Sequence, residues 1–183
     1  RSSDDTAGLS VAITVEMLTG GLCRMRASVT NDAADEYRVN DLVLAYPVPP
    51  VAAELMDYAG HWGKERQPQR REFNVGTHLR EGRKGRTGFE AATVLHAGTP
   101  GFGYRDGEVW GVHVAWSGNH THYAERTFTG DRVLGGGELL LPGELSLETD
   151  ETYESPWVYG AYGRGLDGVA HRFHTYLRSR PQH

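Results

Sequence analysis

The stretch LSVAITVEMLTGGLCRMRASVTND, residues 9–32, predicts a β-hairpin. Every second residue from Leu9 to Met17 is apolar, and the alternation returns from Cys23 to Val29. A period of two places one face of a strand on a core and the other in water. The pair Gly20-Gly21 between the two runs is a turn signal. We therefore expect two antiparallel strands whose apolar faces are buried.

The rest of the chain continues this pattern of short strands. A run at 39–46 ends at PVPP, residues 47–50, where prolines remove backbone donors and are expected to end the strand. Further strands are expected at 92–96, 109–115, 132–134, 138–141 and 155–162, separated by GTPGFG, SGN, LGGG, PGE and YGRG, which are interpreted as turns. Regularly spaced strands of this kind indicate an all-β, antiparallel β-sandwich.

The C-terminal segment has a different period. From Leu166 to Arg178 the apolar residues recur at helical intervals, and Pro181 is expected to end the helix. The sequence therefore predicts a sandwich domain over residues 1–165 and a linker helix over 166–183.

Composition excludes several classes of protein. The 183 residues suffice for one domain, and 24 acidic against 19 basic residues give a net charge of −5. We therefore expect no binding to nucleic acid or to an anionic membrane. No apolar run approaches the length of a membrane span. The single Cys23 suits a reducing compartment, so a cytoplasmic location is expected, and the start at Arg1 predicts that the natural N-terminus lies elsewhere.

The stretch VWGVHVAWSGNHTHYAE, residues 109–125, crowds three histidines behind a strand. His120 and His122 are expected on one side of a strand, but without a cysteine cluster or an HExxH motif we predict neither a metal nor a cofactor. Ser117 lacks the glycines of a nucleophile elbow. Gly118 and Asn119 are expected to supply the positive φ of a tight turn.

Two further patterns have ordinary interpretations. Segment 64–86 holds eight basic residues but, among aromatic residues, only Phe73, which favours a solvated hairpin or an interface over a nucleic-acid surface. Carboxylates such as Glu108 and Glu125 could in principle form a glycosidase pair, but the sequence alone does not pair them. Trp116 is expected in the core, and with Trp62 it suits an inter-domain contact.

Five separated blocks agree in order and spacing with a known family. They are HWGKERQ (61–67), E-x-R-K-G-R (81–86), GEVWGVHVAWSGN (107–119), LLLPGE (139–144) and ESPWVYGAYGRGLDGVAHRFHTYLR (154–178). Over about residues 20–178 the chain resembles the N-terminal β-supersandwich domain of glycoside hydrolase family 36, the family of microbial α-galactosidases acting on melibiose and raffinose-type sugars.

The resemblance implies a division of labour between two domains. In that family, retaining hydrolysis of terminal α-galactosides uses two aspartates on a (β/α)8 barrel that follows the sandwich. No position here matches those motifs, so no catalytic residue is assigned, and the chain is expected to be a non-catalytic fragment of a bacterial enzyme. Its expected partners are its own barrel and further copies in a homo-oligomer. After residue 86 the chain continues TGFEAATVLHAG where many members have Ser-Ser-His and Asn-Pro, so that loop's contacts are not carried over.

Two alternatives remain open on the sequence. One is a free-standing carbohydrate-binding β-sandwich that stacks exposed aromatic rings on sugars, and the other is an enzyme active by itself through acids such as Glu108 and Glu125. The candidate substrate-entrance or interface residues are Trp62, Arg66, Trp116, Ser117 and Asn119.

Overall fold

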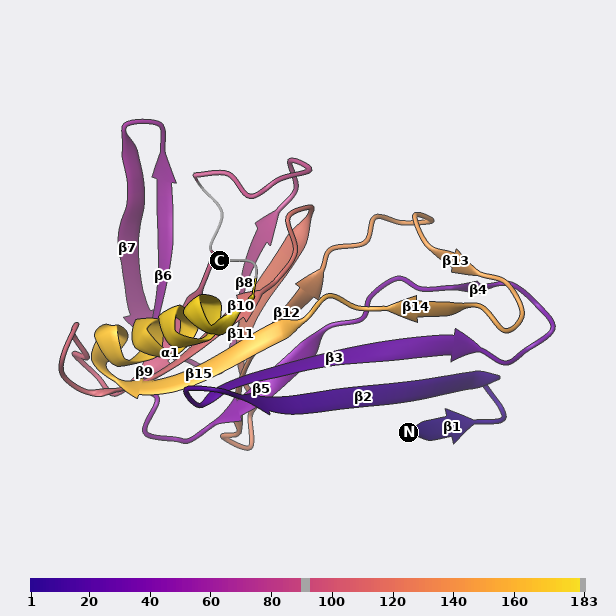
Figure 1. Cartoon of the computed structure of the whole chain (residues 1–183), viewed down its shortest axis with the longest axis horizontal. Helices are drawn as coiled ribbons and strands as arrows, with labels where there is room; N and C mark the ends of the chain where they lie inside the picture. The colour runs from indigo at the N-terminus through magenta and orange to yellow at the C-terminus, as the bar shows by residue number, and fades with distance from the viewer. Residues whose placement is uncertain (90–92, 182–183) are drawn as a thin grey trace.

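The computed structural model describes residues 1–89 and 93–181 and has a predominantly antiparallel β-architecture (Figure 1). A nine-stranded sheet runs in the order β1-β2-β3-β15-β10-β9-β6-β7, with β14 also paired to β3. Its strands are β1 Ser2–Asp4, β2 Leu9–Leu18, β3 Leu22–Asn31, β6 Glu54–His61, β7 Lys64–Glu72, β9 Leu95–Gly98, β10 Glu108–Val114, β14 Thr152–Glu154 and β15 Val158–Arg164.

Two smaller sheets and one helix complete the described fold. The four-stranded sheet has the order β5-β12-β11-β8, and a two-stranded sheet pairs β13 with β4. Their bounds are β4 Tyr37–Arg38, β5 Leu44–Val48, β8 Gly76–Gly82, β11 His120–Arg126, β12 Arg132–Glu138, β13 Ser146–Leu147 and, for the helix, α1 Gly165–Ser179. The expected all-β sandwich with one C-terminal helix is confirmed.

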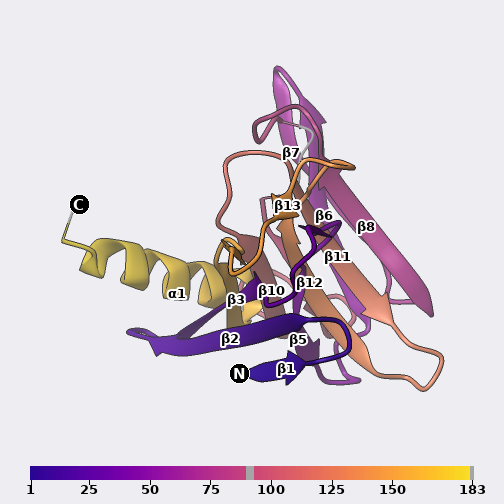
Figure 2. The same cartoon turned by 90° about the vertical axis from the view of Figure 1, so that its right-hand side faces the viewer.

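The core lies in two layers on either side of the large sheet, and Figure 2 shows the helix on one side and the four-stranded sheet on the other. Val112 and Val114 of β10 face the second sheet, where they join a buried cluster with Leu134 of β12. Val109 of the same strand belongs to a second cluster with Val169 of α1. Strand β10 is therefore buried on both faces.

The predicted hairpin at 9–32 is confirmed, because β2 and β3 pair in register from Leu9 and Asn31 to Leu18 and Leu22. The expected burial of its first strand is wrong. Ile13, Val15 and Met17 are 60%, 61% and 72% exposed. They share a face with the buried residues of β3, but β2 lies near the end of the strand order and the second sheet does not cover it.

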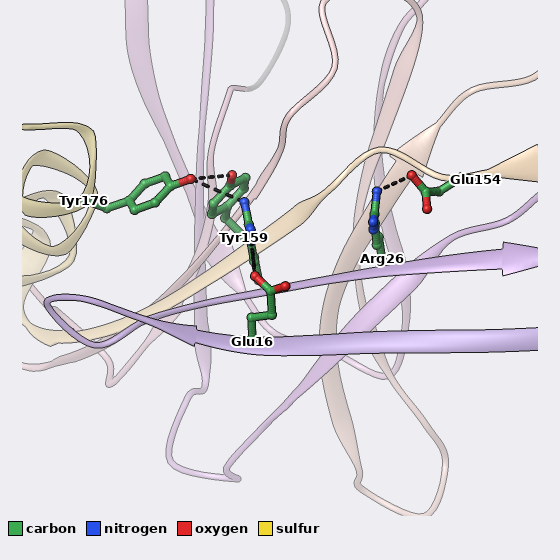
Figure 3. A network of polar contacts seen from close by, with 6 residues as sticks. Glu16, Arg26, Glu154, Tyr159 and Tyr176 are labelled. Atoms are coloured by element: carbon green, nitrogen blue, oxygen red, sulfur yellow. Dashed lines mark hydrogen bonds and ion pairs between the residues drawn. The ribbon is translucent and has the colours of Figure 1, made fainter. Parts of the chain in front are cut away.

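The opposite face of this hairpin is polar. Arg24 donates to Glu16 at 2.7 Å, and Arg26 pairs with Glu154 of β14. Figure 3 shows these contacts together with Tyr159 of β15, whose hydroxyl lies 3.4 Å from that of Tyr176 on α1. This network links β2, β3, β14, β15 and the helix on one side of the sheet.

The interpretation of LGGG and YGRG as turns is wrong, because most of each segment lies inside a strand, where glycine allows close packing. The LGGG segment lies inside β12, so the runs predicted at 132–134 and 138–141 meet in one strand ending at Glu138. A Cβ at Gly136 would lie 2.3 Å from the Thr121 carbonyl oxygen and 2.7 Å from Val114 Cγ2. Most of YGRG likewise belongs to β15, which ends at Arg164. Glycines inside a strand here permit close backbone approach.

The remaining boundaries differ in detail. The run predicted at 39–46 forms a strand only from Leu44 and continues through Pro47. This is possible because β5 is an edge strand that pairs with β12 alone, so a missing N–H is tolerated. The strand predicted from residue 92 begins outside the described residues, and β9 starts at Leu95. In the described part of the chain, no helix has the length and apolar character needed to cross a membrane.

Candidate functional site

Strands β6 and β7 form a hairpin arm whose tip projects from the large sheet (Figure 1), while β6 pairs with β9 at its base and Asp57 of β6 lies 2.8 Å from His78 of β8. Their register shifts between Ala59 and His61, so that Glu65 and Arg66 face the single residue Gly60 in a β-bulge. A Cβ at Gly60 would lie 2.6 Å from the Lys64 carbonyl oxygen, which explains the glycine. Arg66 has a φ of 52°, in the left-handed region that costs energy for a residue with a side chain.

The bulge places Arg66 at the wall of a cavity of about 600 Å³, which we call the hairpin pocket. The pocket lies between the arm and the loop at 83–89 that follows β8. Its lining residues are Tyr58, Glu65, Arg66, Lys84, Arg86, Thr87, Gly88, Phe89 and Thr93. Tyr58, Arg66 and Thr93 also line an adjoining cavity that reaches α1. Arg66 therefore lines both cavities. This position is consistent with the bulge, because a β-bulge changes the direction of a side chain.

Among the described residues that line the hairpin pocket, Arg66, Lys84 and Arg86 are cationic and Glu65 is a carboxylate. Glu65 accepts a hydrogen bond from the backbone N–H of Gly63 at 2.9 Å. Burial raises the pKa of Tyr58, while the positive charge of Arg66 opposes that shift. Such a lining offers hydrogen-bond donors and aromatic faces to a ligand rich in acceptor oxygens.

Two predicted residues hold the 83–89 loop from opposite ends. Trp62, at the tip of the arm and 80% exposed, packs its ring 5.8 Å from that of Phe89. Asn119 accepts a hydrogen bond through Oδ1 from the backbone N–H of Gly85 at 2.8 Å. The structure therefore brings Trp62, Arg66 and Asn119 around one loop.

Trp116 and Ser117 lie on the turn between β10 and β11. Trp116 is 41% exposed, so its predicted place in the core is wrong, because β10 ends at Val114 and the chain then leaves the sheet. Ser117 is also exposed. Gly118 and Asn119 do not have positive φ, contrary to prediction. A Cβ at Gly118 would instead lie 2.7 Å from Trp116 Nε1, so this glycine makes room for the indole.

The three neighbouring histidines are hydrogen-bonded parts of the sheets. The rings of His120 and His122 lie 5.4 Å apart, as expected for residues on one side of a strand. His122 Nε2 accepts from the backbone N–H of Val114 at 3.2 Å, and burial lowers the pKa of His122 to about 3. His113 Nδ1 lies 2.6 Å from the Thr93 carbonyl oxygen. Across residues 1–89 and 93–181, no group of three or more potential ligands is arranged to hold a metal ion.

The acids considered for catalysis belong to different sheets. Glu108 begins β10 and accepts a hydrogen bond from the Tyr162 hydroxyl at 3.0 Å. Glu125 lies on β11 of the four-stranded sheet. Segment 64–86 does not form the predicted hairpin by itself, because β7 pairs with β6 and β8 pairs with β11 in the other sheet. The expected solvent exposure holds for β7, which is exposed along its length and carries a 2.7 Å pair between Arg70 and Glu54.

The sequence analysis missed the aromatic walls of the hairpin pocket and two of its cations, Lys84 and Arg86. Tyr58 lies two residues before Gly60, and a lone glycine in a strand pattern signals a bulge nearby. Phe89 and Arg86 lie in a loop with no periodic signal, and only the fold of the arm brings them beside Arg66.

Comparison with known proteins gives consistent matches. The model of the glycosyl hydrolase family 36 N-terminal domain matches residues 1–148. The alpha-galactosidase of Escherichia coli is 36% identical over 178 residues, which cover 97% of this chain and 25% of that protein. The alpha-galactosidase AgaA of Geobacillus stearothermophilus is 24% identical over 140 residues, 76% of this chain and 19% of its own length.

Solved structures share the fold. The crystal structure of AgaA from Geobacillus stearothermophilus has a TM-score of 0.80 at 22% identity, covering 97% of this chain and 25% of that chain. The alpha-galactosidase from Lactobacillus brevis has a TM-score of 0.80 at 18% identity, with 94% and 24% covered. Other AgaA structures hold raffinose or stachyose. The chain spans about a quarter of the length of these relatives.

Proposed function

Because this chain belongs to the glycosyl hydrolase family 36 N-terminal domain family, we propose that it is the non-catalytic β-sandwich domain of an α-galactosidase. The parent enzyme hydrolyses terminal α-galactosides such as melibiose and raffinose-type sugars by a retaining mechanism, using aspartates of a (β/α)8 barrel outside this chain. The observation that carries the proposal is that 97% of the chain matches a quarter of an alpha-galactosidase.

In this proposal the sandwich supports the barrel, shapes the entrance to its sugar pocket and helps to assemble a homo-oligomer. The hairpin pocket supports the second role, because exposed Trp62 and cationic Arg66 stand on an arm that projects from the sandwich. Aromatic rings stack on sugar faces, and guanidinium groups donate to hydroxyl oxygens. Trp116, Ser117 and Asn119, which lie between β10 and β11, are proposed as further entrance or interface residues.

The test is an assay of the complete reading frame that contains this sequence. Release of galactose from melibiose and raffinose is expected, and Trp62→Ala is expected to raise KM for raffinose by about tenfold with little change in kcat. Phe128→Ala is the matched control, since Phe128 is 92% exposed but lies on the distant turn between β11 and β12. Absence of α-galactoside hydrolysis by the complete protein would overturn the parent activity.

A carbohydrate-binding module is the second candidate, and the exposed Trp62–Phe89 ring pair is the observation that favours it. Calorimetric titration of the 183-residue chain with galactose and melibiose separates the two. Saturable binding that Trp62→Ala abolishes supports direct sugar recognition by the sandwich. Lack of binding by the chain, with hydrolysis by the complete protein, supports the non-catalytic accessory role.

A further inference from the structure

Two arginines face each other at the end of the four-stranded sheet. Arg126, the last residue of β11, lies directly opposite Arg132, the first residue of β12. Directly opposite residues of an antiparallel pair project from the same face, so the two like charges lie close together. Both guanidinium groups lie near Phe73. Arg126 Nη1 donates to the Phe73 carbonyl oxygen at 3.4 Å, and Arg132 Cζ lies 5.8 Å from its ring centroid.

Several N–H groups of these two guanidinium groups are buried without an acceptor. Arg132 is 9% exposed, and its Nε and Nη1 are buried atoms with no hydrogen-bond partner. The Nε of Arg126 is buried and unpartnered as well. Burial and the charge of Arg126 lower the pKa of Arg132. Buried donors are normally hydrogen-bonded and buried charges are normally paired. The two arginines depart from this rule, which indicates that a partner of opposite charge is missing.

The nearby carboxylates do not fill this role. Glu54 accepts from Arg70 at 2.7 Å and from the backbone N–H of Gly101 at 2.5 Å. Asp131 precedes Arg132, and its Oδ2 accepts from Thr129 at 2.9 Å. Within residues 1–89 and 93–181, no ion pair joins Arg126 or Arg132 to an acid.

A ligand can approach through a cavity. Arg126 lines a hollow of about 570 Å³ together with Arg70, Arg71 and Asn74. The carboxylates on its wall are Glu54, which is paired with Arg70, and Glu72. The arginines therefore outnumber the acids around this hollow, and the Asn74 side chain adds a neutral amide donor.

We propose that Arg126 and Arg132 together bind one oxyanion, a carboxylate or a phosphate group, that enters from this cavity. A guanidinium presents its N–H groups in a planar fork that matches the oxygens of either anion. One anion shared by the two arginines relieves their mutual repulsion and gives acceptors to their buried N–H groups. The site is separate from the hairpin pocket and does not depend on the proposed glycosidase role.

The experiment follows the arginine side chains of the full 183-residue chain by nuclear magnetic resonance. Inorganic phosphate and acetate are the probes, titrated at constant ionic strength. The Nε–H resonances of Arg126 and Arg132 are expected to shift together and to saturate, because both Nε atoms lack acceptors. Arg126→Gln and Arg132→Gln are each expected to weaken binding by about tenfold or more. Arg38→Gln is the control, since the Arg38 side chain is 71% exposed on β4.

The relative strength of the two probes identifies the source of the oxyanion. Tighter binding of phosphate supports a phosphorylated ligand, and equal or tighter binding of acetate supports a carboxylate such as an acidic side chain. The proposal is overturned if neither probe gives a saturable shift in the parent chain. It is also overturned if both glutamine variants keep the parent affinity, or if all arginine resonances move alike. Should a variant fail to fold, the titration of the parent chain decides.

Discussion

Strands β10 and β2 both place successive side chains on opposite faces of the large sheet, but of the two only β10 is covered on both faces. In β10, Val112 lies against the four-stranded sheet and Val109 against α1, and both are almost fully buried. In β2, Val15 and Met17 project from the same sheet into solvent. The difference arises because β10 is central in the large sheet, whereas β2 is followed only by the three-residue β1.

Alternation along a strand determines which residues share a face. Whether that face contributes to stability depends on whether another sheet or a helix packs on it. Burial of an apolar side chain contributes about 1.5–3 kcal/mol relative to exposure. The closed region around β10 should therefore dominate the free energy of unfolding, and the open region at β2 should contribute little.

The largest loss of stability in the closed region is expected when β12 is pushed away from β11 and β10. Gly136→Ala places a methyl group 2.3 Å from a backbone oxygen that moves only with its strand, and we expect a loss of about 3 kcal/mol in the free energy of unfolding. Gly103→Ala is the matched control, because a Cβ there meets no atom within 4 Å. Urea denaturation measures both, and similar losses would show that β12 does not press on its neighbours.

Acid should weaken the closed region next. Burial lowers the pKa of His96 on β9 to about 4 and that of His122 on β11 to about 3. The unfolded chain binds these protons near pH 6.5, so the unfolded state is favoured as the pH falls from about 6.5 toward about 4. Between about pH 6.5 and about pH 4, each histidine lowers the free energy of unfolding by up to about 3 kcal/mol. Above about pH 7 neither histidine has this effect, because both are then neutral in the folded and the unfolded chain.

Urea denaturation across that pH range, with His122→Gln and the exposed control His174→Gln, measures the effect. The first variant is expected to flatten the pH dependence and the second to leave it unchanged. Equal pH dependence in both variants would show that His122 titrates normally in the folded protein.

The same substitution in β10 and in β2 measures directly how much burial contributes at each position. Val112→Ala removes methyl groups from a buried site and is expected to cost about 2 kcal/mol. Val15→Ala, at 61% exposure, is expected to change the free energy of unfolding by less than about 0.5 kcal/mol. Chemical denaturation of the two variants gives the ratio. A cost at Val15 that matches Val112 would mean that β2 is covered in solution.

The hairpin arm offers the smallest effect, in the opposite direction. Arg66→Gly relieves a left-handed backbone conformation, so we expect the chain to become about 1 kcal/mol more stable. Gln69→Gly, on the same exposed strand without positive φ, is expected to lose about 0.5–1 kcal/mol. Thermal and urea unfolding compare them, and a loss in both would show that Arg66 is not strained.

Much of the fold could be predicted because its signals are local. The period of two from Leu9 to Met17 and the glycine pair after it fix the first hairpin, and helical spacing predicts a helix at 166–178, against Gly165–Ser179 observed. The five blocks in order indicated the family that the comparisons support. Of the candidate site, the sequence singled out Trp62, Arg66 and Asn119 but not the geometry that joins them.

Only the tertiary structure decided which faces are covered and which distant groups meet. Val15 and Val112 are the same residue type inside strands of the same sheet, and the docking of the second sheet over β10 but not over β2 leaves one exposed and the other buried. Phe73 meets Arg126 and Arg132 because β7 leads into the end of the four-stranded sheet. Periodicity follows from backbone geometry within one strand, whereas coverage and charge pairing depend on residues far apart in the chain, which no local pattern encodes.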